Sequence, residues 1–401
     1  MHKLYKQIGG GLLLALAGLV VAGCSFCFPL KTVAQGENID GENGLTLEKQ
    51  AEKLVSRMSD SQKIGQLLMI GIQGTTLDQD SRYMLSEFPN GNVILFDRNM
   101  KTPEQVQQLT AEIQNQVKAA TGVPAFIGIQ NQVKAATGVP AFIGVDQEGG
   151  QVRRMETYMP DMPAAAVLGK QSPDVTYRWA VETGKSLRQM GINVNFAPVV
   201  DLDGAYQRSY GKTPEEVIPF AKAAIEGYTE TGVMTSLKHF PGIGKVKTDP
   251  HLDGDLVLLN RQELDQLDGK PFRTLIDEMD ADKTFVMVSN VTFPNLGQNV
   301  PACLSKVIMT DILRKSYGYQ GLILTDDMDM GAMAKHYPFS EMGVKAIEAG
   351  ADIVLVCQDY GHVQQVFNGL LKAYRAGTID QKMVDEKVRH IVMVKLKELG
   401  K

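Results

Sequence analysis

The amino-acid sequence predicts an α/β protein, a (β/α)8 TIM-type barrel or a close variant of it, built as a single domain. Short apolar runs alternate along the chain with amphipathic segments of helical length. Continuously apolar strands between helices are typical of a parallel sheet that helices cover. About eight such units follow one another, which is the number that closes a barrel. A doubly wound sheet is the alternative, although no Gly-x-Gly-x-x-Gly motif follows any of the runs.

The alternation assigns a residue range to each expected element. The runs predicted as strands cover residues 67–72, 92–96, 141–145, 194–200, 233–237, 285–288, 322–325 and 353–357. The segments predicted as helices cover residues 103–120, 174–190, 214–231, 261–279, 305–317 and 340–349.

Polar residues follow five of the predicted strands directly. They are Asp146-Gln147-Glu148, Asp201-Leu202-Asp203, Lys238-His239, Ser289-Asn290 and Asp326-Asp327. In a parallel barrel the carboxyl ends of all strands open onto the same face, which is where such barrels carry their active sites. We therefore expect these groups to share one site.

The richest stretch is LKHFPGIGKVKTDPHLDGD, residues 237–255. Its prolines and glycines break any helical or strand period, so it predicts a loop. Within it, Asp249 stands two residues before His251. A carboxylate that accepts the imidazole N–H fixes the tautomer and raises the basicity of the ring, as acid/base catalysis requires. A solvated polar loop in which His251 has no role is the alternative.

A metal site is a second alternative for this loop. Its acidic and glycine residues from Asp249 to Asp255 imitate the first half of a calcium-binding loop, but Asn260 stands where that loop needs glutamate. The chain also has no second histidine cluster that could complete a zinc site. We expect no metal and no cofactor.

KHFPG followed by Asp-x-His resembles the signature of family 3 glycoside hydrolases, in particular the bacterial β-N-acetylglucosaminidase branch. The resemblance implies that His251 is the acid/base group and that Asp249 holds its other ring nitrogen. GLILTDDMD resembles the nucleophile motif of the family, which implies that Asp326 attacks the anomeric carbon with support from Asp327. A helix N-cap is the alternative role for this aspartate pair.

The same resemblance assigns the sugar-binding residues. DQEGGQVRRM matches the sugar-binding segment of the family and implies that Asp146 and Arg154 bind the substrate. Arg208 stands in a matching QRSYG context, and Lys238 and His239 would complete the pocket for N-acetylglucosamine.

The resemblance extends over residues 47–401, with departures near the acid/base loop. Ile243 and Lys245 replace a histidine and an aspartate that are common in the family, and Asn290 stands where many relatives carry histidine. These changes bear on substrate preference and loop closure. We expect a single catalytic domain without the second domain of larger relatives.

The N-terminus resembles a bacterial lipoprotein signal. A basic start and an apolar run too short to span a bilayer lead to Val21-Ala22-Gly23-Cys24. We expect residues 1–23 to be removed, Cys24 to carry lipid, and residues 24–46 to form a tether to the domain at 47–401. The protein would then be extracytoplasmic and anchored to the membrane; secretion without an anchor is the alternative.

Residues 113–128 recur without change as residues 129–144. Two identical copies do not make a repeat architecture, in which copies diverge and are more numerous. The second copy leads directly into Asp146, so we expect it to supply the strand. The added residues should emerge on the barrel face opposite the site.

The resemblance implies a retaining exo-β-N-acetylglucosaminidase that removes terminal N-acetylglucosamine from peptidoglycan fragments. A non-catalytic sugar-binding lipoprotein and a phosphorylase on the same scaffold are the alternatives. The net charge of −5 and the lack of a basic tract argue against nucleic acid as a partner. We expect a monomer whose partners are a small carbohydrate and the membrane.

Overall fold

Eight parallel strands close into a barrel in sequence order in the computed structural model, which describes residues 45–122, 138–246 and 255–400. The described residues belong to the larger of two units in the chain, residues 39–401. The strands are β1 (Leu68–Gly71), β2 (Asn92–Leu95), β3 (Phe142–Val145), β4 (Val194–Asn195), β5 (Met234–Phe240), β6 (Thr284–Val288), β7 (Ile323–Asp327) and β8 (Ile353–Val356). The predicted (β/α)8 barrel is confirmed.

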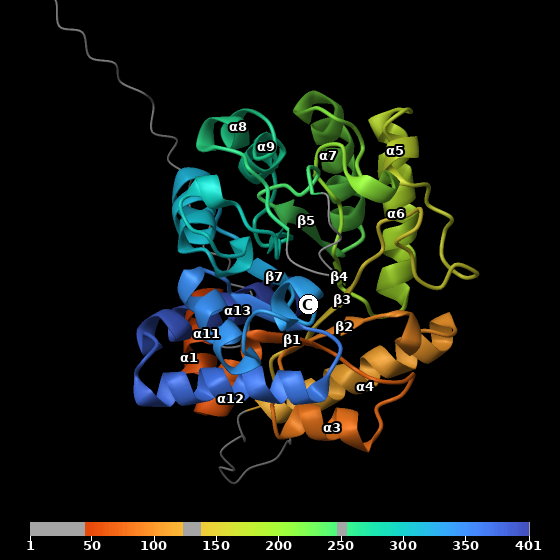
Figure 1. Ribbon diagram of the computed structural model, residues 1–401. Helices are drawn as coiled ribbons and strands as arrows, with labels where there is room; N and C mark the ends of the chain where they lie inside the picture. Colours follow the sequence, from red (N-terminus) through yellow and green to blue (C-terminus); the bar gives the residue numbers. More distant parts are fainter. Residues whose placement is uncertain (1–44, 123–137, 247–254, 401) are drawn as a thin grey trace, which may run out of the picture. The chain divides into compact units, whose positions relative to one another are not determined.

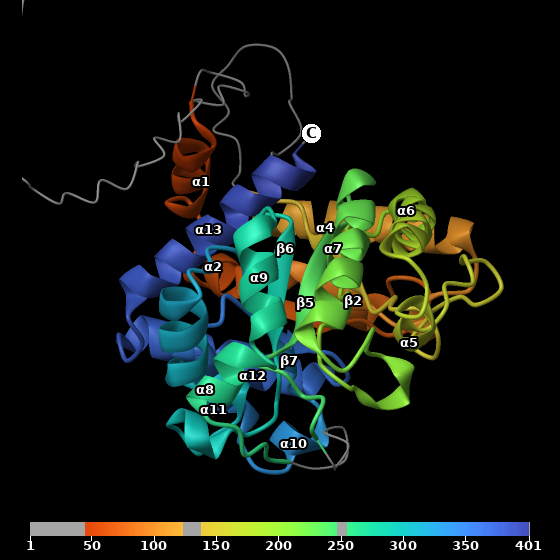
Figure 2. The same ribbon diagram turned by 90° about the horizontal axis from the view of Figure 1, so that it is seen from above.

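Helices form a layer outside the strands (Figure 1, Figure 2). The α-helices are α1 (Leu47–Val55), α2 (Asp60–Gln66), α3 (Gln79–Ser86), α4 (Pro103–Thr121), α5 (Ala165–Leu168), α6 (Pro173–Gln189), α7 (Pro214–Glu230), α8 (Arg261–Gln266), α9 (Lys270–Glu278), α10 (Gly331–Ala334), α11 (Phe339–Ala349), α12 (Tyr360–Ala376) and α13 (Gln381–Leu399). Short 3-10 turns are η1 (Asp97–Asn99), η2 (Ala205–Gln207), η3 (Pro294–Leu296) and η4 (Ala302–Leu304), and η5 (Val307–Ser316) is a π-helix. None of the described helices is long and apolar enough to cross a membrane.

The barrel interior is packed at the end where the strands begin. Phe142 and Phe285 meet edge to face there, with 5.3 Å between ring centroids. Lys395 reaches in from α13, is fully buried, and donates to the Gln66 side chain at 2.7 Å and to the Gly91 carbonyl at 2.9 Å. Burial lowers the pKa of Lys395 well below its usual range. This end of the barrel is therefore closed, and a substrate can enter only at the opposite end.

Each predicted strand forms, and the carboxyl ends of two strands differ from the prediction by three residues or more. β4 stops at Asn195, whereas the prediction continued to residue 200, because Pro198 has no N–H to donate to a neighbouring strand. β5 continues to Phe240, where Phe240 pairs with Val288 of β6. The prediction that residues 237–255 are a loop throughout is thus wrong for the first four of them.

The predicted helix at 261–279 is wrong, because it is two helices, α8 and α9. Pro271 lacks the N–H that would continue the hydrogen bonding of α8. At Gly269 the chain passes so close to Tyr317 that a Cβ atom would lie 2.3 Å from the tyrosine hydroxyl. The predicted helix at 305–317 forms as the π-helix η5 instead.

The two identical copies at 113–144 have separate roles. The first copy supplies the end of α4, and the second supplies β3, as expected. The Thr121 hydroxyl donates to the Val139 carbonyl at 3.2 Å, and Gly138 packs on Lys118 where a Cβ would be 2.0 Å from its carbonyl oxygen. The described chain on either side of residues 123–137 therefore meets at the amino end of β3, opposite the site.

Candidate active site

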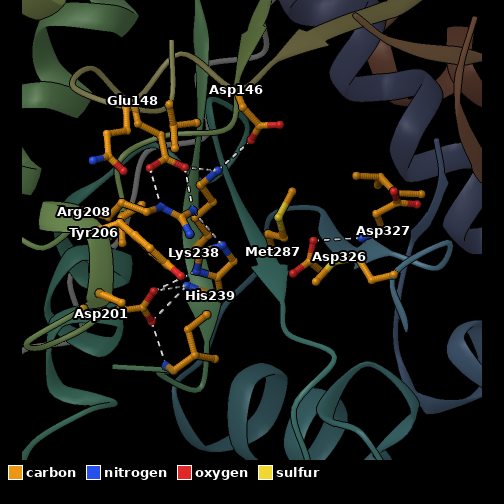
Figure 3. A pocket seen from close by; sticks show the side chains of 18 of the residues that line it. Asp146, Glu148, Asp201, Tyr206, Arg208, Lys238, His239, Met287, Asp326 and Asp327 are labelled. Carbon is orange, nitrogen blue, oxygen red and sulfur yellow. Dashed lines mark hydrogen bonds and ion pairs between the residues drawn. The ribbon is translucent and has the colours of Figure 1, made fainter. Parts of the chain in front are cut away.

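A cavity of about 520 Å³ opens at the carboxyl ends of the strands. All five sugar-binding residues predicted from the sequence line it together with the predicted nucleophile: Asp146, Arg154, Arg208, Lys238, His239 and Asp326. They come from strands or loops spread over 181 positions of the sequence, from 146 to 326. The barrel thus gathers the predicted groups at one site (Figure 3).

Lys238 is the centre of a buried ion cluster on one side of this cavity. The side chain of Lys238 is 3% exposed, and its Nζ lies 2.7 Å from carboxylate oxygens of both Asp146 and Glu148. Burial alone would lower the pKa of Lys238, but the two carboxylates raise it. Lys238 therefore stays charged and holds the Asp146 carboxylate at the wall of the cavity.

Glu148 joins this cluster to Arg208. Arg208 donates from Nε and Nη2 to the two Glu148 oxygens, each at 2.8 Å, in the two-pronged geometry that guanidinium and carboxylate favour. Burial opposes the charge on Glu148, but Lys238 and Arg208 hold the pKa of Glu148 well below its usual range. The two cations, Lys238 and Arg208, thus balance the charges of the two acids of the cluster, Asp146 and Glu148.

Asp201 holds His239 in the same wall. The His239 Nδ1 lies 2.7 Å from an Asp201 oxygen, and its Nε2 lies 3.4 Å from the Arg208 Nη2. Arginine can only donate, so Nε2 accepts and the imidazole proton resides on Nδ1, directed at Asp201. The other Asp201 oxygen accepts the backbone N–H of Ile243 at 2.9 Å. One carboxylate therefore orients the imidazole and fixes the start of the following loop.

Asp326 and Asp327 end β7 on the other side of the cavity (Figure 3). One oxygen of Asp326 accepts the backbone N–H of Asp327 at 2.8 Å, which leaves the second oxygen available to the cavity. Asp327 instead accepts the backbone N–H groups of Asp329 at 3.0 Å and Cys357 at 3.1 Å. The two neighbours thus differ in their contacts: Asp326 faces the cavity and Asp327 ties β7 to β8.

The charge of Asp327 is disfavoured by its position. Burial, followed by the nearby charges of Asp329 and Asp326, raises the pKa of Asp327 to about 6. A carboxyl that is partly protonated near neutral pH repels the charge of Asp326 less than a full carboxylate would.

Arg154 lies at the rim of the cavity. Its guanidinium is 3.3 Å from Asp97 and 6.0 Å from the centre of the Phe96 ring, and its backbone N–H donates to the Gln147 side chain at 2.7 Å. The weak pair with the exposed Asp97 leaves the guanidinium able to exchange this partner for a bound ligand.

Three of the predicted site residues lie outside the described residues: Asp249, His251 and Cys24. The acid/base and lipidation assignments stay predictions. Among the described residues no group of three or more His, Cys, Asp or Glu side chains could hold a metal ion.

The sequence reasoning missed two residues that complete the site. Glu148 was part of the polar strand end after β3, and Asp201 followed the apolar run 194–200, but neither received a role. A signal was available for both, since Asp201 directly follows a predicted strand and Glu148 stands three positions after the end of another. Glu148 pairs with Lys238 and Arg208, and Asp201 pairs with His239. These partners are distant in the sequence, so only the barrel reveals the pairing.

Similar proteins point to one family. The family described as glycosyl hydrolase family 3 N terminal domain matches residues 60–394. A β-hexosaminidase from Nitrosomonas eutropha is 31% identical over 315 residues, which cover 76% of this chain and 84% of that protein. A β-hexosaminidase from Tolumonas auensis is also 31% identical, over 76% of this chain and 86% of its own length.

Solved structures agree with this relationship. A family 3 β-N-acetylglucosaminidase from Paenibacillus has a TM-score of 0.78 at 33% identity, covering 85% of this chain and 63% of that one. A β-N-acetylhexosaminidase from Beutenbergia cavernae has a TM-score of 0.75 at 27% identity, covering 84% of this chain and 98% of that one. With the barrel, the cavity and the matched residues in agreement, this chain belongs to glycosyl hydrolase family 3 and is a glycoside hydrolase.

Proposed function

We propose that this protein is a retaining exo-β-N-acetylglucosaminidase in which Asp326 is the nucleophile and Asp249 with His251 supplies the acid/base group. The observation that carries the proposal is the position of Asp326 across one cavity from the cluster of Asp146, Lys238 and Arg208 (Figure 3). The names of the similar β-hexosaminidases support the same activity.

The geometry suits hydrolysis with retention. That reaction needs a carboxylate beside the anomeric carbon and a second group that first protonates the leaving oxygen and then activates water. Asp326 has one oxygen available to the cavity, and the groups on the facing wall can bind hydroxyls of the sugar. A histidine acid/base avoids a further carboxylate beside Asp326, where like charges would raise the pKa of the nucleophile.

Trapping of the covalent intermediate tests this proposal. The chain without residues 1–24 should release nitrophenol from its β-N-acetylglucosaminide, and a 5-fluoro N-acetylglucosaminyl fluoride should label Asp326, as peptide mass analysis can detect. Asp326→Asn should lower kcat by at least about a thousandfold and prevent labelling. Unchanged turnover by Asp326→Asn, or a label on another residue, would refute the assignment.

The natural substrate in this proposal is a peptidoglycan fragment with a terminal N-acetylglucosamine. Incubation with purified muropeptides should release free N-acetylglucosamine whether or not phosphate is present. If sugar 1-phosphate appears only with phosphate, the enzyme is a phosphorylase. If the sugar binds without turnover, it is a binding protein.

We also propose that the protein is anchored outside the cytoplasm by lipid on Cys24, as an extension of the leader pattern. The full chain should fractionate with membranes and incorporate labelled palmitate, and Cys24→Ser should abolish both. A wild-type chain that carries no label would contradict the anchor without affecting the enzymatic proposal. The monomeric state is a further proposal, testable by sedimentation.

A further inference from the structure

The side chain of Asn290 joins the end of β6 to the backbone of β7. Asn290 lies two positions after Val288, the last residue of β6, and is 2% exposed. Its Nδ2 donates to the backbone carbonyl of Asp327 at 2.8 Å and lies 3.7 Å from the Met330 Sδ. A carbonyl oxygen can only accept, so the amide nitrogen of Asn290, and not its oxygen, faces Asp327. This contact fixes the orientation of the amide.

The thiol of Cys303 holds the oxygen of the same amide. Cys303 lies in η4, is fully buried, and its Sγ is 3.0 Å from the Asn290 Oδ1. Burial, followed by the charge of Asp326, raises the pKa of the Cys303 thiol, so the thiol keeps its proton. The Met333 Sδ, at 3.8 Å, is a more distant and weaker acceptor for that proton. Cys303 therefore donates to Asn290.

Regular strand pairing ends before Asp326 is reached. The ladder between β6 and β7 ends at Thr325, and the pairing of β7 with β8 shifts in register between Leu324 and Asp327. Asp326 lies within this shift, where the backbone is not held by a regular ladder. Beyond Thr325, the contact to β7 from the β6 side comes from the side chain of Asn290.

The residue that Asn290 holds is also the one that contacts the Asp326 carboxylate. The backbone N–H of Asp327 donates to the Asp326 Oδ1 at 2.8 Å (Figure 3). In the described part of the chain, no other group donates a hydrogen bond to the Asp326 side chain. Three hydrogen bonds thus lead in series from the Cys303 thiol through Asn290 and Asp327 to Asp326.

We propose that Asn290 is a positioning residue, which holds the backbone of Asp327 so that its N–H keeps the Asp326 carboxylate directed at the cavity. This inference rests on the proposed function, because it takes Asp326 as the nucleophile. Asn290 itself does not line the cavity and acts through Asp327. Loss of its amide should therefore slow nucleophilic attack and leave the binding of sugar at the ion cluster around Lys238 unchanged.

Asn290→Leu tests this role, because leucine has the same branching and nearly the same size but neither donates nor accepts. The kcat/KM for nitrophenyl β-N-acetylglucosaminide should fall about tenfold, since one hydrogen bond contributes up to about that factor. The acidic limb of kcat/KM against pH should move to higher pH, because a poorly held N–H favours the charged carboxylate less. The Ki of N-acetylglucosamine should stay within about twofold, since the sugar-binding wall is untouched.

Asn193→Leu is the matched control. Asn193 is also 2% exposed, and its side chain accepts from the backbone of Ile143 at 2.8 Å and donates to that of Ala141 at 3.1 Å. These contacts lie at the amino end of β3, opposite the cavity. Asn193→Leu should therefore leave kcat/KM and the acidic limb as in the wild type. A melting temperature for each variant shows that it is folded.

Cys303 gives a second test, which decides the matter if Asn290→Leu does not fold. Cys303→Ala removes the donor to Asn290 and should move the acidic limb in the same direction as Asn290→Leu, but by less. Cys303→Ser keeps a donor at this position and should restore the wild-type limb. Rescue by serine would not be expected if Cys303 only filled space in the core.

Four results would overturn the inference: an acidic limb that Asn290→Leu does not move, a Ki that rises as much as kcat/KM falls, the same shift in Asn193→Leu, or a Cys303→Ser variant as impaired as Cys303→Ala. The proposed function is decided on the wild-type enzyme. Absence of turnover, or a fluorosugar label on a residue other than Asp326, would remove the proposed function and the inference with it. A label on Asp326 together with an unaffected Asn290→Leu variant would remove the inference alone.

Discussion

Two carboxyl groups of the cavity, Glu148 and Asp327, have their pKa values shifted in opposite directions. Glu148 contacts the cations of Lys238 and Arg208, which outweigh its burial and lower its pKa. Asp327 has backbone N–H partners but forms no ion pair with a described residue, so burial and neighbouring acids raise its pKa to about 6. The presence or absence of a paired cation thus decides the direction in which the pKa of each buried acid is shifted.

Glu148→Gln should destabilise the fold strongly. The substitution leaves the charges of Lys238 and Arg208 with fewer partners in a buried site, which costs about 3–5 kcal/mol of unfolding free energy. Urea unfolding at pH 7 measures this loss of unfolding free energy. Glu278→Gln is the control, since Glu278 pairs with Lys222 at 2.7 Å where both side chains are 41% exposed, and such pairs contribute less than about 1 kcal/mol.

The effect of Glu148→Gln should also depend on pH. A lowered folded-state pKa means that the charged Glu148 contributes stability above its ordinary value of 4.5 and loses it as the pH falls further. The difference between wild type and Glu148→Gln should therefore be largest near neutral pH and shrink below about pH 4.5. A constant difference from pH 7 to pH 3 would contradict the ion cluster as its source.

Asp327→Asn should change the pH dependence of stability in the opposite sense. A folded-state pKa of about 6, above the ordinary 3.8, makes the folded protein bind more protons in this interval, so stability falls as the pH rises through it. The amide of Asp327→Asn does not titrate, so the variant avoids this loss of stability. Its unfolding free energy at pH 7 should be higher than that of the wild type by up to about 3 kcal/mol, and by less where cavity water screens the carboxyl. Unfolding curves at pH 4, 5, 6 and 7 test the slope, with the exposed Asp277→Asn as control.

At the scale of elements, β5 supplies two neighbouring residues, Lys238 and His239, to one cavity. Successive side chains of a regular strand point to opposite faces, so only one of the two would be expected there. The pairing of β5 with β6 is shifted in register between Leu237 and Phe240, which breaks the alternation at these two positions. This irregularity places both the ion-cluster lysine and the Asp201-bound imidazole in the site.

The N-cap of α7 should stabilise the helix that precedes β5. The Thr213 hydroxyl accepts the backbone N–H of Glu216 at 3.3 Å, and the Glu216 side chain accepts the N–H of Thr213 at 3.1 Å. Thr213→Ala should lower the unfolding free energy by about 1 kcal/mol. Ser172→Ala at the start of α6 is the control, because the Ser172 side chain makes no cap hydrogen bond. Equal losses in the two variants would show that the cap is not responsible.

At the scale of the whole molecule, the barrel separates stability from chemistry. One end is closed by the Phe142–Phe285 pair and the buried Lys395, and the other end carries the cavity. Changes at the closed end should therefore leave the site intact. The duplicated segment enters the fold at that end.

Deletion of residues 122–137, which removes one copy, should preserve both fold and activity. The Thr121 hydroxyl already contacts the Val139 carbonyl at 3.2 Å, so Thr121 can be followed directly by Gly138 and Val139 with little rearrangement. The kcat/KM of the shortened chain should stay within about twofold of the full chain. Its melting temperature should be equal or higher, since a shorter connection costs less loop-closure entropy. A loss of folding or activity would mean that the extra residues are integral to the structure.

The eight apolar runs were sufficient to predict the barrel, because a strand that is buried on both faces needs apolar residues throughout its length. The same local signal indicated the carboxyl ends at Asp146, Lys238 and Asp326. The family resemblance, not the pattern, gave these residues their roles. The break between α8 and α9 had a local signal in Pro271, which the prediction of one helix did not use, whereas the approach of Tyr317 to Gly269 is visible only in the structure.

By itself the sequence determined the fold class, the face that carries the site and most of the residues on it, since hydrophobic periodicity and strand ends are local properties. Only the tertiary structure decided which acid meets which cation: Glu148 with Lys238 and Arg208, and Asp201 with His239. Those partners are 38 to 90 positions apart in the sequence, with Asp201 and His239 at one extreme and Glu148 and Lys238 at the other. Charge pairing depends on distance in space, and closure of the barrel sets that distance.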